Sequence, residues 1–171
     1  MDKILESLAH ALGQRLCQRN LTLVTAESCT GGWIAKAITD IPGSSGWLER
    51  GFVTYSNAAK QELLGVPPET LAQHGAVSEA TVTQMALGAL AHSPADVAIA
   101  VSGIAGPDGG TPDKPVGTVW LAWALPGQEV RTRRECFPGD RDTVRRQTVR
   151  LALEVLIGLL HDPHRHVHGG S

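Results

Sequence analysis

Three short segments of the sequence hold side chains that could take part in chemistry, and each follows a predicted β-strand. The first is Glu27-Ser28-Cys29-Thr30-Gly31-Gly32, which places Ser28 shortly after the end of a predicted strand at 21–25. Free backbone N–H groups at the helix start that follows favour an oxyanion or a phosphate, so Ser28 is a candidate nucleophile. Ser28 or Thr30 could equally be no more than the helix cap. Glu27 is a candidate base or a carboxylate that orients this segment.

The second segment runs from Tyr55 to Lys60, after a predicted strand at 52–55. A tyrosine and a lysine at the end of one strand can carry protons beside a serine. A lone helical lysine is more often solvated, however. The sequence pattern therefore leaves Lys60 open between a proton acceptor and a surface side chain.

The third segment is the glycine-rich stretch from Gly103 to Pro112. Its glycines leave room for a ligand to touch the main chain, and a long irregular segment in a compact domain usually has a function. An ordinary surface loop is the alternative. The stretch is not a dinucleotide-binding fingerprint, because the prolines within and after it prevent a helix from opening there.

Two arginines near the start of the last predicted helix, Arg141 and Arg145, are candidates for binding a phosphate. The planar guanidinium group matches phosphate geometry with two parallel hydrogen bonds. Arginines on a helix are also often solvated. The pattern does not distinguish these two roles.

The spacing of apolar residues predicts alternating strands and helices. Helices are predicted at 3–19, from 31 to 41, at 57–64, from 78 onward and at 140–160, and strands at 21–25, 52–55, 96–102, 116–124 and 129–137. This alternation, with a hairpin at one edge, predicts a single three-layer α/β/α domain with a mixed, mostly parallel sheet. Ligands of such sheets bind at the carboxyl ends of the strands, so the three reactive segments should meet there.

Composition narrows the class of protein. With 15 basic and 17 acidic side chains, the chain has a net charge of −2 and no general field for nucleic acid. No apolar run approaches the ~20 residues of a membrane span, and the charged N-terminus does not resemble a signal peptide. We therefore expect a cytoplasmic protein that binds neither nucleic acid nor membranes.

The three cysteines, Cys17, Cys29 and Cys136, are odd in number and lack CxxC spacing, which favours reduced thiols over disulfides or zinc ligands. Cys29 is a rival nucleophile to Ser28, because a thiol near a helix N-terminus can have a lowered pKa. We expect residues 1–162 to form the domain and residues 163–171 to be a flexible His-rich tail, for which metal binding is a minor alternative.

Several longer motifs resemble one known family. They are Thr25-Ala26-Glu27-Ser28-Cys29-Thr30-Gly31-Gly32, Gly51-Phe52-Val53-Thr54-Tyr55-Ser56-Asn57, Gly75-Ala76-Val77-Ser78, Ser102 to Gly110 and Lys114 to Val119. In this order they closely resemble the CinA C-terminal domain, in its stand-alone form. The resemblance implies a nicotinamide-nucleotide amidohydrolase, with the family's catalytic serine, tyrosine and lysine at Ser28, Tyr55 and Lys60.

The resulting hypothesis is that Ser28 attacks the carboxamide of nicotinamide mononucleotide, Lys60 accepts its proton, and Tyr55 relays protons or supports the oxyanion. We expect no metal or other cofactor, and a homodimer. The candidate substrate-binding residues are Thr30, Gly31, Ser45, Gly103, Ile104, Ala105, Gly106, Gly109, Arg141 and Arg145.

Two other functions compete with this hypothesis. A short-chain oxidoreductase also combines Ser, Tyr and Lys, but its tyrosine and lysine are spaced four apart, whereas Tyr55 and Lys60 are five apart, and the early glycine fingerprint is missing. A non-catalytic interaction module linked to competence or DNA damage is the alternative from another class. Ammonia release from the nucleotide would separate the enzyme from that module.

Overall fold

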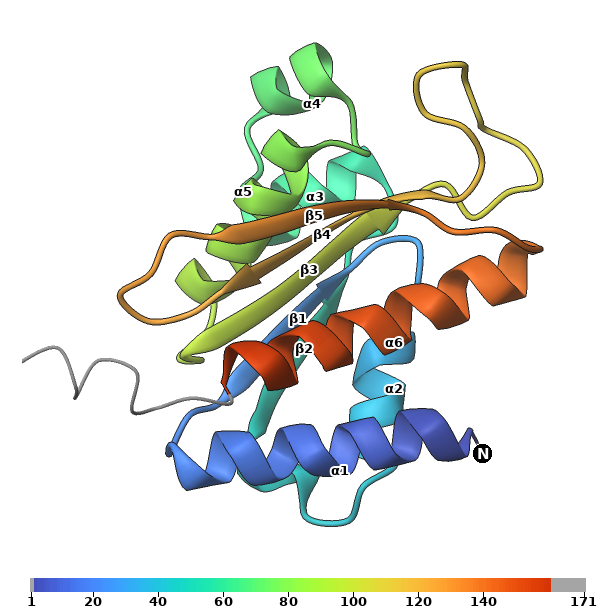
Figure 1. The fold of residues 1–171 in the computed structure, drawn as a ribbon. Helices are drawn as coiled ribbons and strands as arrows, with labels where there is room; N and C mark the ends of the chain where they lie inside the picture. The colour runs from blue at the N-terminus through green and yellow to red at the C-terminus, as the bar shows by residue number, and fades with distance from the viewer. Residues whose placement is uncertain (1, 161–171) are drawn as a thin grey trace, which may run out of the picture.

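The structure is a computed structural model that describes residues 2–160, in which a five-stranded sheet lies between two layers of helices (Figure 1). The elements in chain order are α1 Lys3–Gln18, β1 Leu23–Glu27, α2 Trp33–Thr39, the 3₁₀ turn η1 Ser44–Gly46, β2 Leu48–Val53, α3 Asn57–Leu64, α4 Pro68–His74, α5 Glu79–Ala91, β3 Val97–Gly103, β4 Thr118–Ala124, β5 Arg131–Cys136 and α6 Arg141–Leu159. The predicted single α/β domain is confirmed.

The sheet is mixed, with strand order β2-β1-β3-β4-β5. β1 pairs in parallel with β2 and β3, whereas β4 pairs antiparallel with β3 and β5. Four strands therefore run in one direction and β4 runs against them. The β4–β5 pair is the predicted hairpin at one edge.

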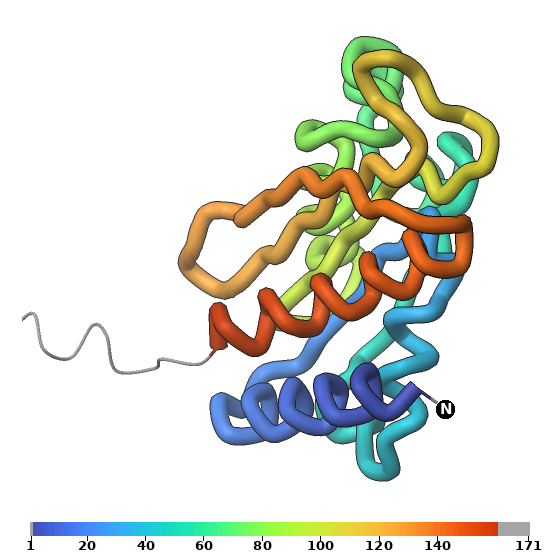
Figure 2. Tube along the Cα trace, turned by 45° about the vertical axis from the view of Figure 1, so that its right-hand side comes forward, coloured from blue at the N-terminus to red at the C-terminus, as the bar shows by residue number. Residues whose placement is uncertain are grey.

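Alternation along the strands divides the core into two layers. In β3, Val97, Ile99 and Val101 pack with α1, α2 and α6, whereas Ala98 and Ala100 pack with α3, α4 and α5. Successive side chains of a strand point to opposite faces, so one apolar run serves both layers. The views in Figures 1 and 2 show α1, α2 and α6 on one face of the sheet and α3, α4 and α5 on the other.

Two predicted strands are shifted in the structure. β1 begins at Leu23, because the Thr22 N–H and hydroxyl bind the Asp96 carboxylate and thereby tie the segment before β1 to the segment before β3. β2 begins at Leu48 and ends at Val53. Both shifts leave the ends of β1 and β2 close to where the reactive segments were predicted to begin.

One helix was not predicted at all. α4 begins at Pro68, which was expected only to end the preceding helix. Proline is favoured in the first turn of a helix, because a backbone N–H there would have no partner within the helix and its absence costs nothing. Gly75 ends α4 with a positive φ of 78°. The predicted loop at 42–46 likewise contains the short turn η1.

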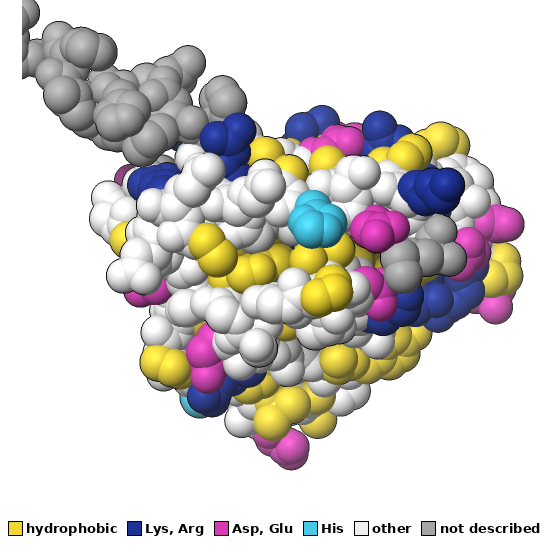
Figure 3. Space-filling model, turned by 90° about the horizontal axis from the view of Figure 1, so that it is seen from below, with side chains coloured by type: hydrophobic (Ala, Val, Ile, Leu, Met, Phe, Trp, Pro, Cys, Tyr) yellow, Lys and Arg dark blue, Asp and Glu magenta, His cyan; other side chains and the backbone are white. Residues whose placement is uncertain are grey.

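Within residues 2–160, no helix is both long and apolar enough to cross a membrane. On the face shown in Figure 3, acidic and basic side chains lie next to one another. The His-rich tail at 163–171 and its predicted flexibility lie outside the described residues.

Candidate active site

A cavity of about 240 Å³ lies where the carboxyl ends of β1, β2 and β3 meet. All three reactive segments predicted from the sequence contribute to its lining, through Ser28, Tyr55, Lys60, Gly103 and Ala105. Its floor is buried, since Ser28 and Lys60 are 7% and 1% exposed, while Tyr55 at its rim is 63% exposed. The parallel strands thus bring together side chains that are far apart in the sequence.

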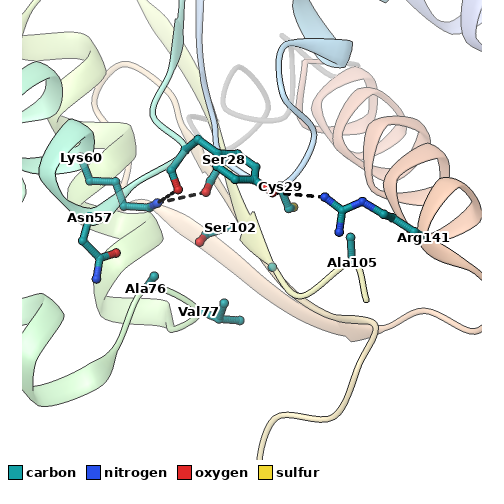
Figure 4. A pocket seen from close by; sticks show the side chains of 11 residues that line it. Ser28, Cys29, Asn57, Lys60, Ala76, Val77, Ser102, Ala105 and Arg141 are labelled. Carbon is teal, nitrogen blue, oxygen red and sulfur yellow. Dashed lines mark hydrogen bonds between the residues drawn. The ribbon is translucent and has the colours of Figure 1, made fainter. Parts of the chain in front are cut away.

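A hydrogen bond between two side chains on this floor joins Lys60 to Ser28, with Nζ 3.0 Å from Oγ (Figure 4). Local structure explains how the lysine arrives there. The Ser56 hydroxyl caps α3 by accepting from the Ala59 N–H, and Lys60 and Leu64, one turn apart, form the buried face of this helix. The Lys60 amine also donates to the carbonyl oxygens of Thr54 and Tyr55, at 2.9 and 3.4 Å.

Burial lowers the pKa of Lys60 below its ordinary value, because the ammonium ion loses its hydration; a weaker opposing effect comes from Cys29. A neutral amine has two N–H donors and one lone pair. In the structure Nζ is the donor to Ser28 Oγ as well as to both carbonyl oxygens. Once the amine is neutral, the carbonyl oxygens keep the two N–H donors and the lone pair faces the Ser28 hydroxyl. This set of partners therefore suits a proton acceptor for Ser28.

The pKa of Cys29, the rival nucleophile, is shifted in the opposite direction to the one expected. Burial, and secondarily the charge of Glu27, raises the pKa of its thiol to about 12. The expectation of a lowered pKa at the helix start is wrong, because the side chain is desolvated and lies beside a carboxylate. The thiol remains protonated near neutral pH.

Glu27 points to the opposite face of the sheet from Ser28 and caps α2. Its carboxylate accepts from the Thr30 hydroxyl at 2.5 Å and from the N–H groups of Ile34 and Ala35 at 2.8 and 3.1 Å. Burial raises its pKa, and these hydrogen bonds oppose that rise. Of the two roles considered, its position matches a residue that orients the serine turn.

The two candidate arginines occupy different places. Arg141 lines the cavity and donates to the Gly106 carbonyl oxygen at 2.7 Å and to the Tyr55 hydroxyl at 3.1 Å. Arg145 instead donates to the carbonyl oxygens of Cys29 and Thr30, at 3.0 and 3.2 Å, and lies over the ring of Trp33. Arg145 therefore fixes the serine turn from outside the cavity.

The other predicted binding residues also lie in different places, some beside the cavity and some away from it. Thr30 and Gly31 line a separate groove with Arg145, and the Gly31 N–H is already bonded to the Ser28 carbonyl oxygen at 3.1 Å. Ser45 lies in η1, before the start of β2 and so away from the carboxyl end of that strand. The loop after β3 also carries Ile104, Gly106 and Gly109.

Packing accounts for the first glycine of this loop. A Cβ on Gly103 would lie 2.6 Å from Val119 and 2.9 Å from the Thr118 carbonyl oxygen. Gly103 therefore permits the close approach of β3 to β4, whatever its role toward a ligand.

Four residues that line the cavity were not predicted from the sequence, namely Asn57, Ala76, Val77 and Ser102. For Ser102 a signal was present, since it is the polar residue near the end of an otherwise apolar strand. Within the described part of the chain, no group of three or more His, Cys, Asp or Glu side chains could hold a metal ion.

The fold and the site together define a three-layer α/β protein with a buried serine–lysine pair at the carboxyl ends of parallel strands. Comparison with known families makes this specific: the chain belongs to the CinA C-terminal domain family, whose model matches residues 5–160. The resemblance inferred from the motifs is confirmed.

Its similarity to individual proteins extends over nearly the whole chain. It is 62% identical over 155 residues to the nicotinamide-nucleotide amidohydrolase PncC of Escherichia coli (strain K12), covering 91% of this chain and 94% of that one. It is 57% identical over 159 residues to the protein of the same name in Pseudomonas putida, covering 93% and 98%. The crystal structure of the competence/damage inducible protein CihA from Agrobacterium tumefaciens superposes with a TM-score of 0.90 at 48% identity, covering 93% and 97%.

Proposed function

We propose that this protein hydrolyses the carboxamide of nicotinamide mononucleotide to nicotinate mononucleotide and ammonia, with Ser28 as nucleophile and Lys60 as general base. The contact of 3.0 Å between Lys60 Nζ and Ser28 Oγ at the floor of the cavity is the observation that carries this proposal. The amidohydrolase names of relatives at 62% and 57% identity support the choice of substrate.

In the first half of the reaction, Ser28 Oγ attacks the carboxamide carbon while its proton passes to the neutral Lys60 amine. The pyridinium charge of the substrate withdraws electrons and makes this carbon more electrophilic. The tetrahedral intermediate then collapses: the C–N bond breaks, the Lys60 ammonium returns the proton to the leaving nitrogen, and ammonia departs. An ester between Ser28 and the nicotinoyl group remains.

In the second half, water attacks the ester and gives a proton to Lys60. The C–O bond to Ser28 breaks, Ser28 regains the proton, and nicotinate mononucleotide leaves. Lys60 thus ends each half-reaction as a neutral amine. Its lowered pKa supports this role, because a lysine with the ordinary pKa of about 10.4 would be charged near neutral pH.

The layout of the cavity suggests how the nucleotide is oriented. The reacting groups lie on the buried floor, whereas Arg141 and Tyr55 are exposed at the rim. At about 240 Å³ the cavity is smaller than the ~300 Å³ at the lower end of typical ligand pockets. We therefore place the pyridine carboxamide inside and the phosphate at the rim, beside the guanidinium of Arg141.

Tyr55 supports this arrangement from the rim. Its hydroxyl accepts a hydrogen bond from Arg141 at 3.1 Å, while only its backbone carbonyl oxygen contacts Lys60. We assign Tyr55 to holding Arg141 and the substrate, and the proton transfer to Lys60.

The test is release of ammonia from nicotinamide mononucleotide by the purified protein, with the acid product identified by chromatography. Wild type should turn over, and Ser28→Ala should lose orders of magnitude in kcat while keeping its melting temperature. A wild-type protein without turnover would contradict the proposal and favour the non-catalytic interaction module. The expected homodimer is tested by light scattering after size exclusion, and the expected cytoplasmic location by cell fractionation.

A further inference from the structure

Ser102 is the direct neighbour of Ser28 in the sheet. Glu27 of β1 pairs in parallel register with Val101 of β3, and the Ser28 N–H continues the ladder to the Val101 carbonyl oxygen at 3.1 Å. Ser28 and Ser102 are the next residues along the two strands, so their side chains project to the same face of the sheet, where neighbouring strands lie about 4.7–4.9 Å apart. Lys60 approaches this pair from α3 on that face.

The Ser102 side chain is only 1% exposed, yet it lines the cavity. Figure 4 shows its oxygen beside Ser28 with no hydrogen bond drawn to it. Several other buried hydroxyls are bonded, such as Thr30 to Glu27 and Thr148 to the Val144 carbonyl oxygen. The Thr25 hydroxyl has no partner either, but it is fully enclosed within the protein. Among the residues that the structure describes, the Ser102 hydroxyl has no such partner, and the open side of this group is the cavity.

Because the Ser102 hydroxyl lines the cavity and has no hydrogen-bond partner within the described residues, it is free to donate to a ligand group held there. The group that comes closest to Ser28 during the reaction is the carboxamide. When Ser28 attacks, negative charge develops on the carboxamide oxygen, and hydrogen-bond donors fixed in advance at that position lower the barrier. Lys60 is engaged in accepting the Ser28 proton, so it is not the donor for this oxygen.

We propose that Ser102 is a further catalytic residue, whose hydroxyl donates a hydrogen bond to the carboxamide oxygen as Ser28 attacks. This role rests on the proposed amidohydrolase function and adds a contact that strengthens in the transition state. Because a strand fixes the serine, no loop movement is needed to bring the donor into place. After the ester is hydrolysed, the same hydroxyl contacts a carboxylate oxygen of the product.

The test compares Ser102→Ala with wild type in kcat, in KM and in binding of nicotinamide mononucleotide, the last in a Ser28→Ala background that cannot turn over. The loss of one such donor lowers kcat about 10²–10³-fold. Binding of the nucleotide should be unchanged, because the contact strengthens only as charge develops. Ser44→Ala is the matched control: Ser44 is also buried, but it lies in η1 before β2, and this variant should keep wild-type kcat.

Ser102→Cys is the second variant, in case Ser102→Ala does not fold. It keeps a side chain of similar size but replaces a strong donor by a weak one, so its kcat should fall between those of wild type and Ser102→Ala. A folded Ser102→Ala or Ser102→Cys protein with wild-type kcat would overturn the proposal. So would a variant that loses nucleotide binding but keeps kcat. Absence of turnover in wild type would instead overturn the amidohydrolase function itself.

Discussion

Lys60→Arg should nearly abolish turnover while the protein still folds and binds the nucleotide. The arginine guanidinium keeps a positive charge, has five N–H donors and no acceptor, and does not deprotonate in a protein. It can satisfy the carbonyl oxygens of Thr54 and Tyr55, as Lys60 does, but it cannot take the proton from Ser28. The substitution therefore removes the base and retains the charge.

The expected size of the loss follows from the role. General-base catalysis contributes about 10²–10⁴-fold, which at about 1.36 kcal/mol per factor of ten is roughly 3–5 kcal/mol of barrier. Lys60 Nζ lies 3.0 Å from Ser28 Oγ, within hydrogen-bonding distance, so the loss should be near the upper end. Lys36→Arg is the matched control, because Lys36 is 63% exposed and bonded to Asp40, and it should keep wild-type kcat.

The pH dependence of turnover tests whether Lys60 acts as a neutral amine. Because burial lowers the pKa of Lys60, wild-type kcat/KM should rise with pH as the ammonium loses its proton, with a midpoint below the ~10.4 of a free lysine. The positive pyridinium of the bound substrate disfavours a second cation, so the midpoint of kcat should be lower still. Both profiles are measured by ammonia release with melting temperature and nucleotide binding as controls. Substantial turnover by Lys60→Arg would refute the assignment and move the base to Tyr55.

The same pKa can be measured without turnover. In the window between the folded pKa of Lys60 and about 10.4, the unfolded chain binds more protons than the native one, so stability rises with pH. Below this window the native state bears the full cost of the buried charge. Urea unfolding should therefore show wild type gaining stability relative to Lys60→Met as pH rises through the window. A difference that is independent of pH would contradict a lowered pKa.

Three further predictions concern other parts of the molecule. Cys29→Ala should keep most activity and wild type should survive iodoacetamide, since a thiol with a pKa of about 12 stays protonated; a folded but inactive Cys29→Ala would make the thiol the nucleophile. Arg141→Ala should lower kcat/KM for nicotinamide mononucleotide about 10–10²-fold, from the ~1.5–3 kcal/mol of a hydrogen bond to a charged group. It should leave kcat/KM for nicotinamide riboside, which we expect to be a poor substrate because it lacks the phosphate, unchanged. An equal loss on both compounds would show that Arg141 does not act through the phosphate. Gly88→Ala should destabilise the fold by about 1–3 kcal/mol or more, because its Cβ would lie 1.9 Å from the Leu64 carbonyl oxygen, whereas Gly158→Ala, with nothing within 4 Å, should stabilise it in thermal unfolding.

Local patterns were sufficient for most of the fold. α3 was predicted with its observed limits, because Ser56 caps its start and Gly65 follows its end with a left-handed φ of 68°. The two-layer packing of β3 also follows from its continuous apolar run. α4 was missed because Pro68 was taken as a breaker, although at the start of a helix it favours the helix.

The site was predictable only as far as strand ends and helix faces allow. Ser28 could be placed from the strand end, whereas the pattern left Lys60 open between a proton acceptor and a surface side chain. Only the packing of α3 shows that Lys60 is buried. Arg141 and Arg145 could not be distinguished, because residues one turn apart lie on the same side of a helix and only its packing decides which one enters the cavity. The polar character of Ser102 at the end of an apolar strand was a signal, but its place beside Ser28 follows only from the register of β1 against β3 in the structure.

The measurement that tests the central claim most directly is hydroxylamine trapping of the ester on Ser28. Wild type given nicotinamide mononucleotide and hydroxylamine should form the hydroxamate of the nucleotide at the expense of nicotinate mononucleotide, because both products come from one acyl-enzyme. Ser28→Ala should form neither. If wild type releases ammonia and forms the acid but no hydroxamate, or if Ser28→Ala turns over, water attacks the carboxamide directly and the nucleophilic role of Ser28 is contradicted.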